Sequence, residues 1–319
     1  MLCSSNRPVP HLSQANTIAG MNTGVHDVSS LSWRLAGVLK GWYKPEVLAN
    51  YSDERHASSK QLINNDKIVS KLIAGQRPAE LEKDPRDTNI LLDEAIREQG
   101  PFILGLGISY DANLLNDVVG SYPPIGPKPG SRAPDALVQK PGIPQISVRL
   151  LEVIKQDGKF KVVVFTGLAH KTHSALQALR VQVDNYKGQF DHAMDFLTLV
   201  AGTDTVFDEH LGMRRFGKAY WDLDHSAHGK YGIPVAQGAI AVIRPDGILG
   251  FVSALDGFDR VIQYLDRLIV GRKSGVKAVA NGHATKKELG TFMGQNENNL
   301  NMPLANGGQN EGGAVRSTL

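Results

Sequence analysis

The stretch Gly20–Asp27, which reads Gly-Met-Asn-Thr-Gly-Val-His-Asp, combines residue types that can bind a negatively charged group. Glycine lets the backbone approach a ligand closely, the Asn22 side chain can donate and accept hydrogen bonds, and free N–H groups at a helix N-terminus stabilise an anion. Apolar residues at helical spacing follow directly, which predicts a helix with Asp27 as its N-cap. In isolation, such a motif is more often a glycine-rich lead-in to an ordinary helix.

The histidines are a second candidate for chemistry. They include two His-x-x-His pairs and have two aspartates nearby; the residues are His170, His173, His210, His225, His228, Asp222 and Asp224. The pairs fall in predicted loops with no cysteine and no helix to fix ligand geometry, so we expect solvated loops and no metal site. Acid–base chemistry by Asp222, Asp224 and His225 is a minor alternative, since the pattern contains no nucleophile.

The residues that follow Gly20–Asp27 extend the motif. Ser-Trp-Arg-Leu-Ala occupies 32–36, Gly41 comes next, and Tyr51 precedes the pair Glu54-Arg55. This series resembles the FAD-dependent aromatic-ring monooxygenases of the phenol hydroxylase (phenol 2-monooxygenase) type, in which Gly-Met-Asn-Thr-Gly-x-x-Asp opens a long helix.

The resemblance implies that Gly20, Met21 and Asn22 bind FAD. Reduced flavin and its oxygen adduct carry negative charge at the pyrimidine edge, and the Met21 and Asn22 amides would face that edge. The family's activity is hydroxylation of a phenolic or other aromatic substrate with NADPH and O2, in phenolic degradation or secondary metabolism. No catalytic residue is identified in this sequence by the resemblance.

Two later pieces, Gly130–Asp135 (Gly-Ser-Arg-Ala-Pro-Asp) and Arg244–Gly247 (Arg-Pro-Asp-Gly), resemble the C-terminal domain of phenol hydroxylase. That domain is thioredoxin-like without a catalytic cysteine pair, in keeping with a chain whose single cysteine is Cys3. The resemblance associates it with dimerisation and implies a homodimer. By itself, Arg-Pro-Asp-Gly would be only a good hairpin turn.

The resemblance covers about Gly20 to Val270, the second half of the family pattern. A Gly-x-Gly-x-x-Gly phosphate loop and a Gly-Asp-Ala-Ala-His stretch are not found in the sequence, and Gly105-Leu106-Gly107 is a poor substitute. Two alternatives therefore stay open beside the monooxygenase. One is a non-catalytic, thioredoxin-like dimerisation or interaction module derived from such an enzyme; the other is a cysteine-free thioredoxin-like scaffold unrelated to flavin.

The predicted fold class is α/β, a helical remnant of the FAD domain followed by a thioredoxin-like C-terminal domain. Residues 1–120 would be the mostly helical C-terminal part of the FAD and substrate domain. A linker rich in Pro and Gly occupies 121–134, and the thioredoxin-like dimerisation domain 135–272. The tail, 273–319, is rich in Asn and Gly and is expected to be disordered.

Apolar spacing and turn residues predict three helices in the first region: from Asp27 to Gly41, from Pro45 to the Gly75–Pro78 break, and Asn89–Glu98. The first two should pack as an antiparallel pair. Because the family's first half is not matched, residues up to about 100 should expose an apolar face and be less stable than residues 130–270.

The second region alternates strands and helices. The expected elements are a hairpin of Ser147–Glu152 with Lys161–Phe165, a helix Ser174–Tyr186, a strand Phe196–Val200, a hairpin of Gly238–Ile243 with Ile248–Val252, and a helix Phe258–Val270. This order is compatible with a thioredoxin-like layer.

The composition argues against several classes of partner. The net charge is +3, but basic and acidic residues are interspersed, which argues against a nucleic-acid partner. No apolar run approaches the roughly 20 residues of a membrane span, and the first 20 residues lack the apolar core of a secretory signal. We therefore expect a cytoplasmic protein with no membrane partner.

Overall fold

The computed structural model describes residues 10–116, 126–142, 146–202 and 206–272, with only the backbone described for 10–20. Residues 121–125 of the expected linker and the expected disordered tail lie outside the described residues. The domain boundaries therefore stay predictions. Among the described helices, none is long and apolar enough to cross a membrane.

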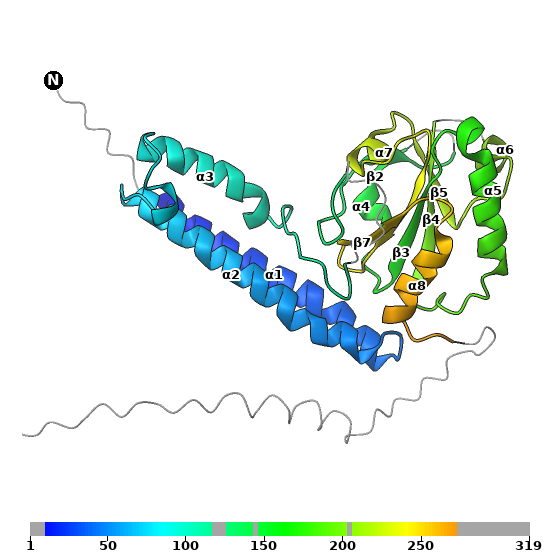
Figure 1. The fold of residues 1–319 in the computed structure, drawn as a ribbon, viewed down its shortest axis with the longest axis horizontal. Coiled ribbons are helices and arrows are strands. Elements are labelled where there is room, and N and C mark those ends of the chain that lie inside the picture. The colour runs from blue at the N-terminus through cyan, green and yellow to red at the C-terminus, as the bar shows by residue number, and fades with distance from the viewer. Residues whose placement is uncertain (1–9, 117–125, 143–145, 203–205, 273–319) are drawn as a thin grey trace, which may run out of the picture. The chain divides into compact units, whose positions relative to one another are not determined.

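Three helices form the first region (Figure 1): α1 (Pro10–Leu39), α2 (Pro45–Ile73) and α3 (Thr88–Ile103), with a 3-10 turn at Ala79–Leu81. Gly41 has a φ of +64°, which suits the turn after α1, and Pro45 stands in the first turn of α2. α1 and α2 lie side by side, as predicted. Asp87 caps α3 by accepting a hydrogen bond from the Asn89 N–H at 2.8 Å.

The expected start of the first helix at Asp27 is wrong. α1 begins at Pro10, so Gly20–Asp27 lies inside the helix. The Asp27 carboxylate, which was expected to cap the helix, instead accepts a hydrogen bond from Arg55 of α2. The glycines at 20 and 24 are tolerated in a helix interior at a cost of about 1 kcal/mol each, so their presence alone did not define a boundary.

A seven-stranded sheet forms the second region, in the order β2-β1-β5-β4-β3-β6-β7. The strands are β1 (Leu137–Gln139), β2 (Ser147–Arg149), β3 (Phe160–Phe165), β4 (Met194–Ala201), β5 (Lys218–Asp222), β6 (Ala239–Ile243) and β7 (Leu249–Ser253). The helices are α4 (Leu150–Val153), α5 (Ala169–Asn185), α6 (Phe207–Leu211), α7 (Ser226–Lys230) and α8 (Phe258–Leu268). β3 runs parallel to β4, and β4 to β5, while the other pairs are antiparallel. This confirms the predicted α/β fold with a thioredoxin-like layer.

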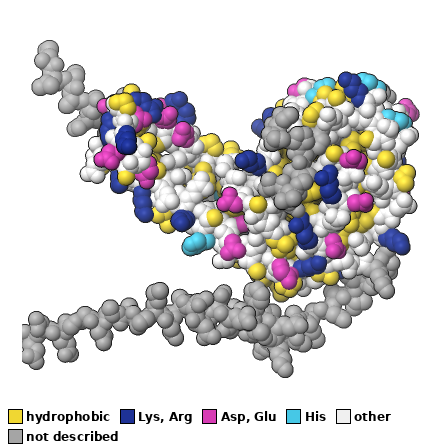
Figure 2. Space-filling view, viewed as in Figure 1, with side chains coloured by type: hydrophobic (Ala, Val, Ile, Leu, Met, Phe, Trp, Pro, Cys, Tyr) yellow, Lys and Arg dark blue, Asp and Glu magenta, His cyan; other side chains and the backbone are white. Residues whose placement is uncertain are grey.

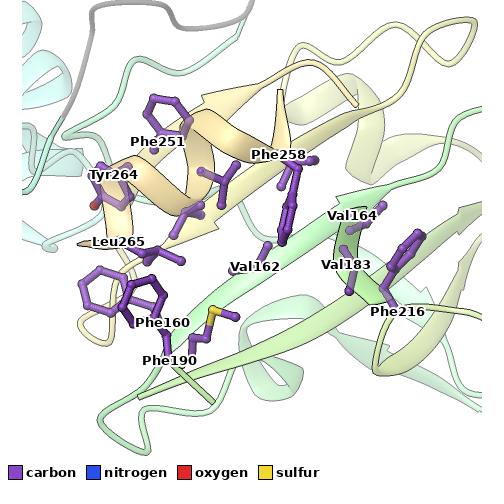
Figure 3. Close-up of a cluster of buried hydrophobic side chains, with 14 of the residues drawn as sticks. Phe160, Val162, Val164, Val183, Phe190, Phe216, Phe251, Phe258, Tyr264 and Leu265 are labelled. Atoms are coloured by element: carbon purple, nitrogen blue, oxygen red, sulfur yellow. The ribbon is translucent and has the colours of Figure 1, made fainter. Parts of the chain in front are cut away.

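Both faces of the sheet are covered. Val162 and Val164 of β3 belong to one apolar core together with side chains of α5 and α8 (Figure 3), whereas Val163 and Phe165 belong to a second core with side chains of α4 and α7. Successive residues of a strand point to opposite faces, so one continuous apolar strand supplies both cores.

The predicted hairpin between Ser147–Glu152 and Lys161–Phe165 is wrong. β2 ends at Arg149 and pairs with β1, and Leu150–Val153 turns into α4. β3 pairs instead with β4 and β6. An entirely buried strand needs a neighbour on each edge, and a local hairpin would have supplied only one. The second predicted hairpin, β6 with β7 around Arg244–Gly247, is confirmed.

Candidate functional site

The predicted flavin-binding residues Gly20, Met21 and Asn22 all lie within α1. Inside a helix each backbone N–H bonds the carbonyl four residues earlier, so the Met21 and Asn22 amides are not the free donors that the sequence predicted. The Met21 side chain is 64% exposed. The Asn22 side-chain amide donates to the Ile103 carbonyl at 2.9 Å, which ties α1 to the end of α3.

Space for a ligand beside Asn22 is small. A crevice of about 10 Å³ is lined by Asn22, His26 and Arg55 among others, and a second of about 20 Å³ lies between His26 and Arg132. Burial lowers the pKa of His26, and the positive charges of Arg132 and Arg55 lower it further. Each crevice has room for about one water molecule. The described residues therefore do not enclose a flavin by themselves, and FAD does not fit here without further walls.

Four charged side chains are buried where the helix pair meets the sheet: Arg34 of α1, Glu54 of α2, and Arg244 and Asp246 of the β6–β7 turn. We call them the charge cluster. Their side chains are between 0% and 7% exposed. Arg244 binds both oxygens of Glu54, at 2.7 and 2.9 Å, and both oxygens of Asp246, at 3.1 and 2.7 Å. Arg34 donates to the second oxygen of Glu54 at 2.5 Å. Two cations and two anions thus neutralise each other out of contact with water.

Neutral polar groups complete the cluster. The Trp33 indole N–H donates to Asp246 at 3.1 Å, and the Asn116 side chain accepts from Arg244 at 2.8 Å. The Asn113 side chain donates to Glu54 at 3.0 Å. Such bonds make buried charges tolerable, and they fill most of the remaining positions of the cluster. Among the described residues, the Arg34 Nε–H has no partner.

The protonation of the cluster follows from these contacts. Desolvation raises the pKa values of Glu54 and Asp246, but the guanidinium groups of Arg244 and Arg34 outweigh it, and both pKa values lie below the ordinary range. Desolvation lowers the pKa of Arg244, but the two carboxylates outweigh it and hold that pKa well above the ordinary one. Burial, and then the positive charge of Arg244, lower the pKa of Arg34. The lowered pKa values of Glu54 and Asp246 keep both carboxylates ionised at neutral pH.

An aromatic contact adds to the same junction. Trp33 of α1, Tyr43 of the α1–α2 loop and Phe160 of β3 pack edge to face, with ring centroids 5.4 to 5.9 Å apart. Gly37 is required for this contact, because a Cβ at that position would overlap the Tyr43 ring. The helix pair is thereby fixed to the apolar core of the sheet as well as to its charged turn.

The junction brings together residues from the two resemblances in the sequence. Trp33, Arg34 and Glu54 belong to the first, the Arg244–Gly247 turn belongs to the second, and the structure places them in contact. The turn was predicted; the burial of its charges was not. Arg214 and Arg215 are exposed side chains in ion pairs on the surface.

The prediction of solvated histidine loops is wrong in part. His170 and His173 lie in α5, and His228 lies in α7, fully buried. Its Nδ1 is 2.6 Å from an Asp222 oxygen, and its Nε2 accepts the Gly167 N–H at 3.2 Å. The pair fixes the turn between β3 and α5. Within the described ranges, no group of three or more His, Cys, Asp or Glu side chains could hold a metal ion.

Comparison with known proteins agrees with this fold. The sequence profile described as "Phenol hydroxylase, C-terminal dimerisation domain" matches residues 109–273, more than half of the 319 residues, and an "FAD binding domain" profile matches residues 11–66. Together, the two matches place the protein in the class of flavoprotein hydroxylases. The chain belongs to the family of the phenol hydroxylase C-terminal dimerisation domain.

Curated relatives are FAD-dependent monooxygenases. FAD-dependent monooxygenase ankC of Aspergillus thermomutatus is 26% identical, over 80% of this chain and 45% of the relative. Phenol 2-monooxygenase fsqG of Aspergillus fumigatus is 24% identical, over 80% of this chain and 46% of the relative. The crystal structure of the flavin-dependent monooxygenase PieE with FAD and substrate aligns at a TM-score of 0.50 with 16% identity, over 78% of this chain and 45% of PieE, and supports the fold. The chain spans less than half the length of each of these proteins.

Proposed function

We propose that this chain works as part of an FAD-dependent monooxygenase that hydroxylates a phenolic or other aromatic substrate with NADPH and O2. One observation carries the proposal. A segment matching the FAD-binding domain, residues 11–66, is joined through the charge cluster to a segment matching the phenol hydroxylase dimerisation domain, residues 109–273. The two matched segments are in direct contact through buried hydrogen bonds.

In this proposal, Gly20, Met21 and Asn22 form one strip of the flavin site. When bound, FAD would supply the oxygen-activating chemistry, and the strip would contribute backbone and the Asn22 side chain. Because the described residues leave only crevices beside Asn22, the strip needs a further protein layer to enclose the cofactor. Binding of FAD is therefore expected of the complete assembly, and only weakly of this chain alone.

The test is the flavin content and phenol-dependent NADPH oxidation of the protein isolated from its own source. Variants Gly20→Leu and Asn22→Leu should lose FAD, whereas the control Asn64→Leu, on an exposed position of α2, should keep it. A colourless protein that does not take up added FAD at micromolar concentration would contradict the proposal.

The second candidate is a non-catalytic, thioredoxin-like dimerisation module. It is favoured by the position of the Met21 and Asn22 amides inside a helix. It predicts a colourless homodimer, assembled through the C-terminal domain, whose mass in sedimentation is twice that of the chain. Homodimerisation by itself fits both candidates, so flavin content decides between them.

A further inference from the structure

The face of the sheet that carries the second core, with α4 and α7, is only partly covered. α4 has four residues and α7 has five, whereas α5 and α8 on the other face have 17 and 11. A helix extends by about 1.5 Å per residue, so the two short helices leave part of this face open. A cavity of about 520 Å³ lies there, beside the end of α4, and we call it the basic pocket.

The floor of the basic pocket is apolar. Leu197 of β4 stands opposite Lys218 of β5 on this face, with Tyr220 two residues further along β5. Val148, Val153 and Tyr220 pack against the second core and also line the pocket. An apolar ligand body on this floor would therefore continue the core and remove further apolar surface from water. Cavities of about 300–1,000 Å³ with such a lining are the usual binding sites of small molecules.

Positive charge surrounds this floor. The pocket is lined by four lysines: Lys140, Lys155, Lys161 and Lys218. Lys161 is neutralised, because its ammonium group lies 2.7 Å from an Asp157 oxygen and 2.8 Å from an Asp195 oxygen. The other three lysines are exposed, and none has an acidic partner among the described residues. Glu152 is the remaining carboxylate of the lining, so three unpaired cations stand against one unpaired anion.

Another hollow at the same sheet provides the comparison. Its volume is about 430 Å³, and three arginines line it: Arg180, Arg214 and Arg215. Each of them pairs with Asp184 or Asp208, at distances of 2.7 to 3.4 Å. Basic and acidic side chains are also mixed over the face drawn in Figure 2, as on an ordinary solvated surface. The basic pocket differs from that hollow because most of its cations are left without a protein partner.

We infer that the basic pocket binds a small amphipathic anion, with an apolar body on the floor and a carboxylate or sulfonate at the lysines. Unpaired like charges around one cavity repel each other, and an anion among them relieves that repulsion. A lysine ammonium only donates hydrogen bonds, and its bonds to an anion are the strong ones. An inorganic anion would leave the floor unused, and a neutral apolar molecule would leave the lysines unused. The site goes beyond the proposed function, since none of its lining residues lies in the FAD-matched segment 11–66.

Calorimetric titration of the full chain with 2-naphthoate tests the inference. Saturable binding of one molecule per chain is expected. Naphthalene-2-carboxamide has the same rings without the charge, and it should bind about tenfold more weakly or not at all. The absence of saturable 2-naphthoate binding, or equal binding of the carboxamide, would overturn the inference. Equal affinity for a hexaglutamate peptide would also overturn it, because that peptide has charge but no apolar body.

Substitution of lysines locates the site. Lys155→Gln with Lys218→Gln removes two of the three unpaired cations and should weaken 2-naphthoate binding about tenfold. The matched control, Lys71→Gln with Lys187→Gln, removes two exposed lysines elsewhere and should bind like the unmodified protein. Both double variants change only exposed side chains, so both should keep the thermal stability of the unmodified protein. Equal 2-naphthoate affinity in the two double variants would overturn the inference.

Discussion

The sheet and the helix pair are stabilised in different ways. The sheet has an apolar core on each face, and its central strand β3 is buried along its whole length. The helices have only a small apolar cluster, between α2 and α3. The charge cluster and three aromatic rings hold α1 at the sheet, while five large apolar side chains on its outward face are exposed: Met21, Val25, Val28, Leu35 and Leu39. The sheet can therefore be stable by itself, and the helices depend on contacts with other parts of the protein.

The difference is also visible between the two faces of α1. Buried hydrogen bonds from Trp33 and Arg34 fix the position of α1 on the sheet. A buried charge tolerates few alternative arrangements of its partners. On its other face, five large apolar side chains are exposed in the described part of the chain. The following predictions test this division, from the largest expected effect to the smallest.

Removal of the central carboxylate should have the largest effect. In Glu54→Ala, the guanidinium groups of Arg34 and Arg244 are left buried with Asp246 as their one remaining anion, which should cost about 3–5 kcal/mol of unfolding free energy. Urea denaturation measures the loss. The control, Asp53→Ala at the exposed neighbouring position, should change stability by about 0.5 kcal/mol or less. A small effect of Glu54→Ala would show that the cluster does not hold the helices.

Acid should weaken the same junction. The pKa values of Glu54 and Asp246 are lowered in the folded protein, so the unfolded chain binds more protons once the pH falls to about 4. Their stabilising contribution is complete above that pH and is lost as the pH falls through the folded pKa values. Unfolding free energies at pH 7 and in acid should show a smaller pH dependence for Glu54→Gln than for the unmodified protein. If the pH dependence of the unfolding free energy were the same in Glu54→Gln, Glu54 would not contribute to the loss of stability in acid.

Two glycines of α1 should respond in opposite directions to the same substitution. Gly37→Ala places a methyl group in the Tyr43 ring and should cost about 1–3 kcal/mol. In Gly24→Ala the new methyl group has no atom within 4 Å. This substitution should stabilise the isolated chain by about 0.5–1 kcal/mol, because alanine favours the helix. Thermal unfolding of both variants measures the contrast. Equal effects would mean that the inner and outer faces of α1 do not differ as described.

An exposed ion pair should have the smallest effect. Arg97 and Asp93 of α3 form an ion pair, with 2.6 Å between a guanidinium nitrogen and a carboxylate oxygen, and their side chains are 79% and 73% exposed. Arg97→Ala should change the unfolding free energy by about 0.5 kcal/mol or less, since water screens such pairs. A loss as large as that of Glu54→Ala would contradict the view that burial gives the charge cluster its importance.

The local parts of the fold could be predicted from the sequence. Proline at 45 and glycine at 75 mark the ends of α2, and Pro245 with Gly247 marks the β6–β7 turn, because these residues act on their own backbone. The partners of β3 could not be predicted, since strand pairing depends on residues far apart in the chain. The strands β1 and β5 were missed because they are short or lack a clear alternation.

The candidate site shows the same limit. Glu54, Trp33 and the Arg244–Gly247 turn were noticed as motif residues, but Glu54 and Arg244 are 190 positions apart and nothing local indicates their contact. Charged residues in a turn are normally exposed, so their burial here is a property of the assembled junction. Asp27 was expected to cap a helix because that role needs only its own segment, whereas its actual partner, Arg55, lies on another helix.

Amide hydrogen exchange of the isolated chain tests the central contrast most directly. Exchange should reach the amides of α1 and α2 through partial opening, well before those of β3, β4 and β6. The reason is that the helices share only a small apolar cluster, whereas the strands lie between two large cores. In Glu54→Ala this gap should widen while the strands keep their protection. Equal protection of helices and strands would contradict the account, because the exposed apolar face of α1 would then not weaken the helix pair.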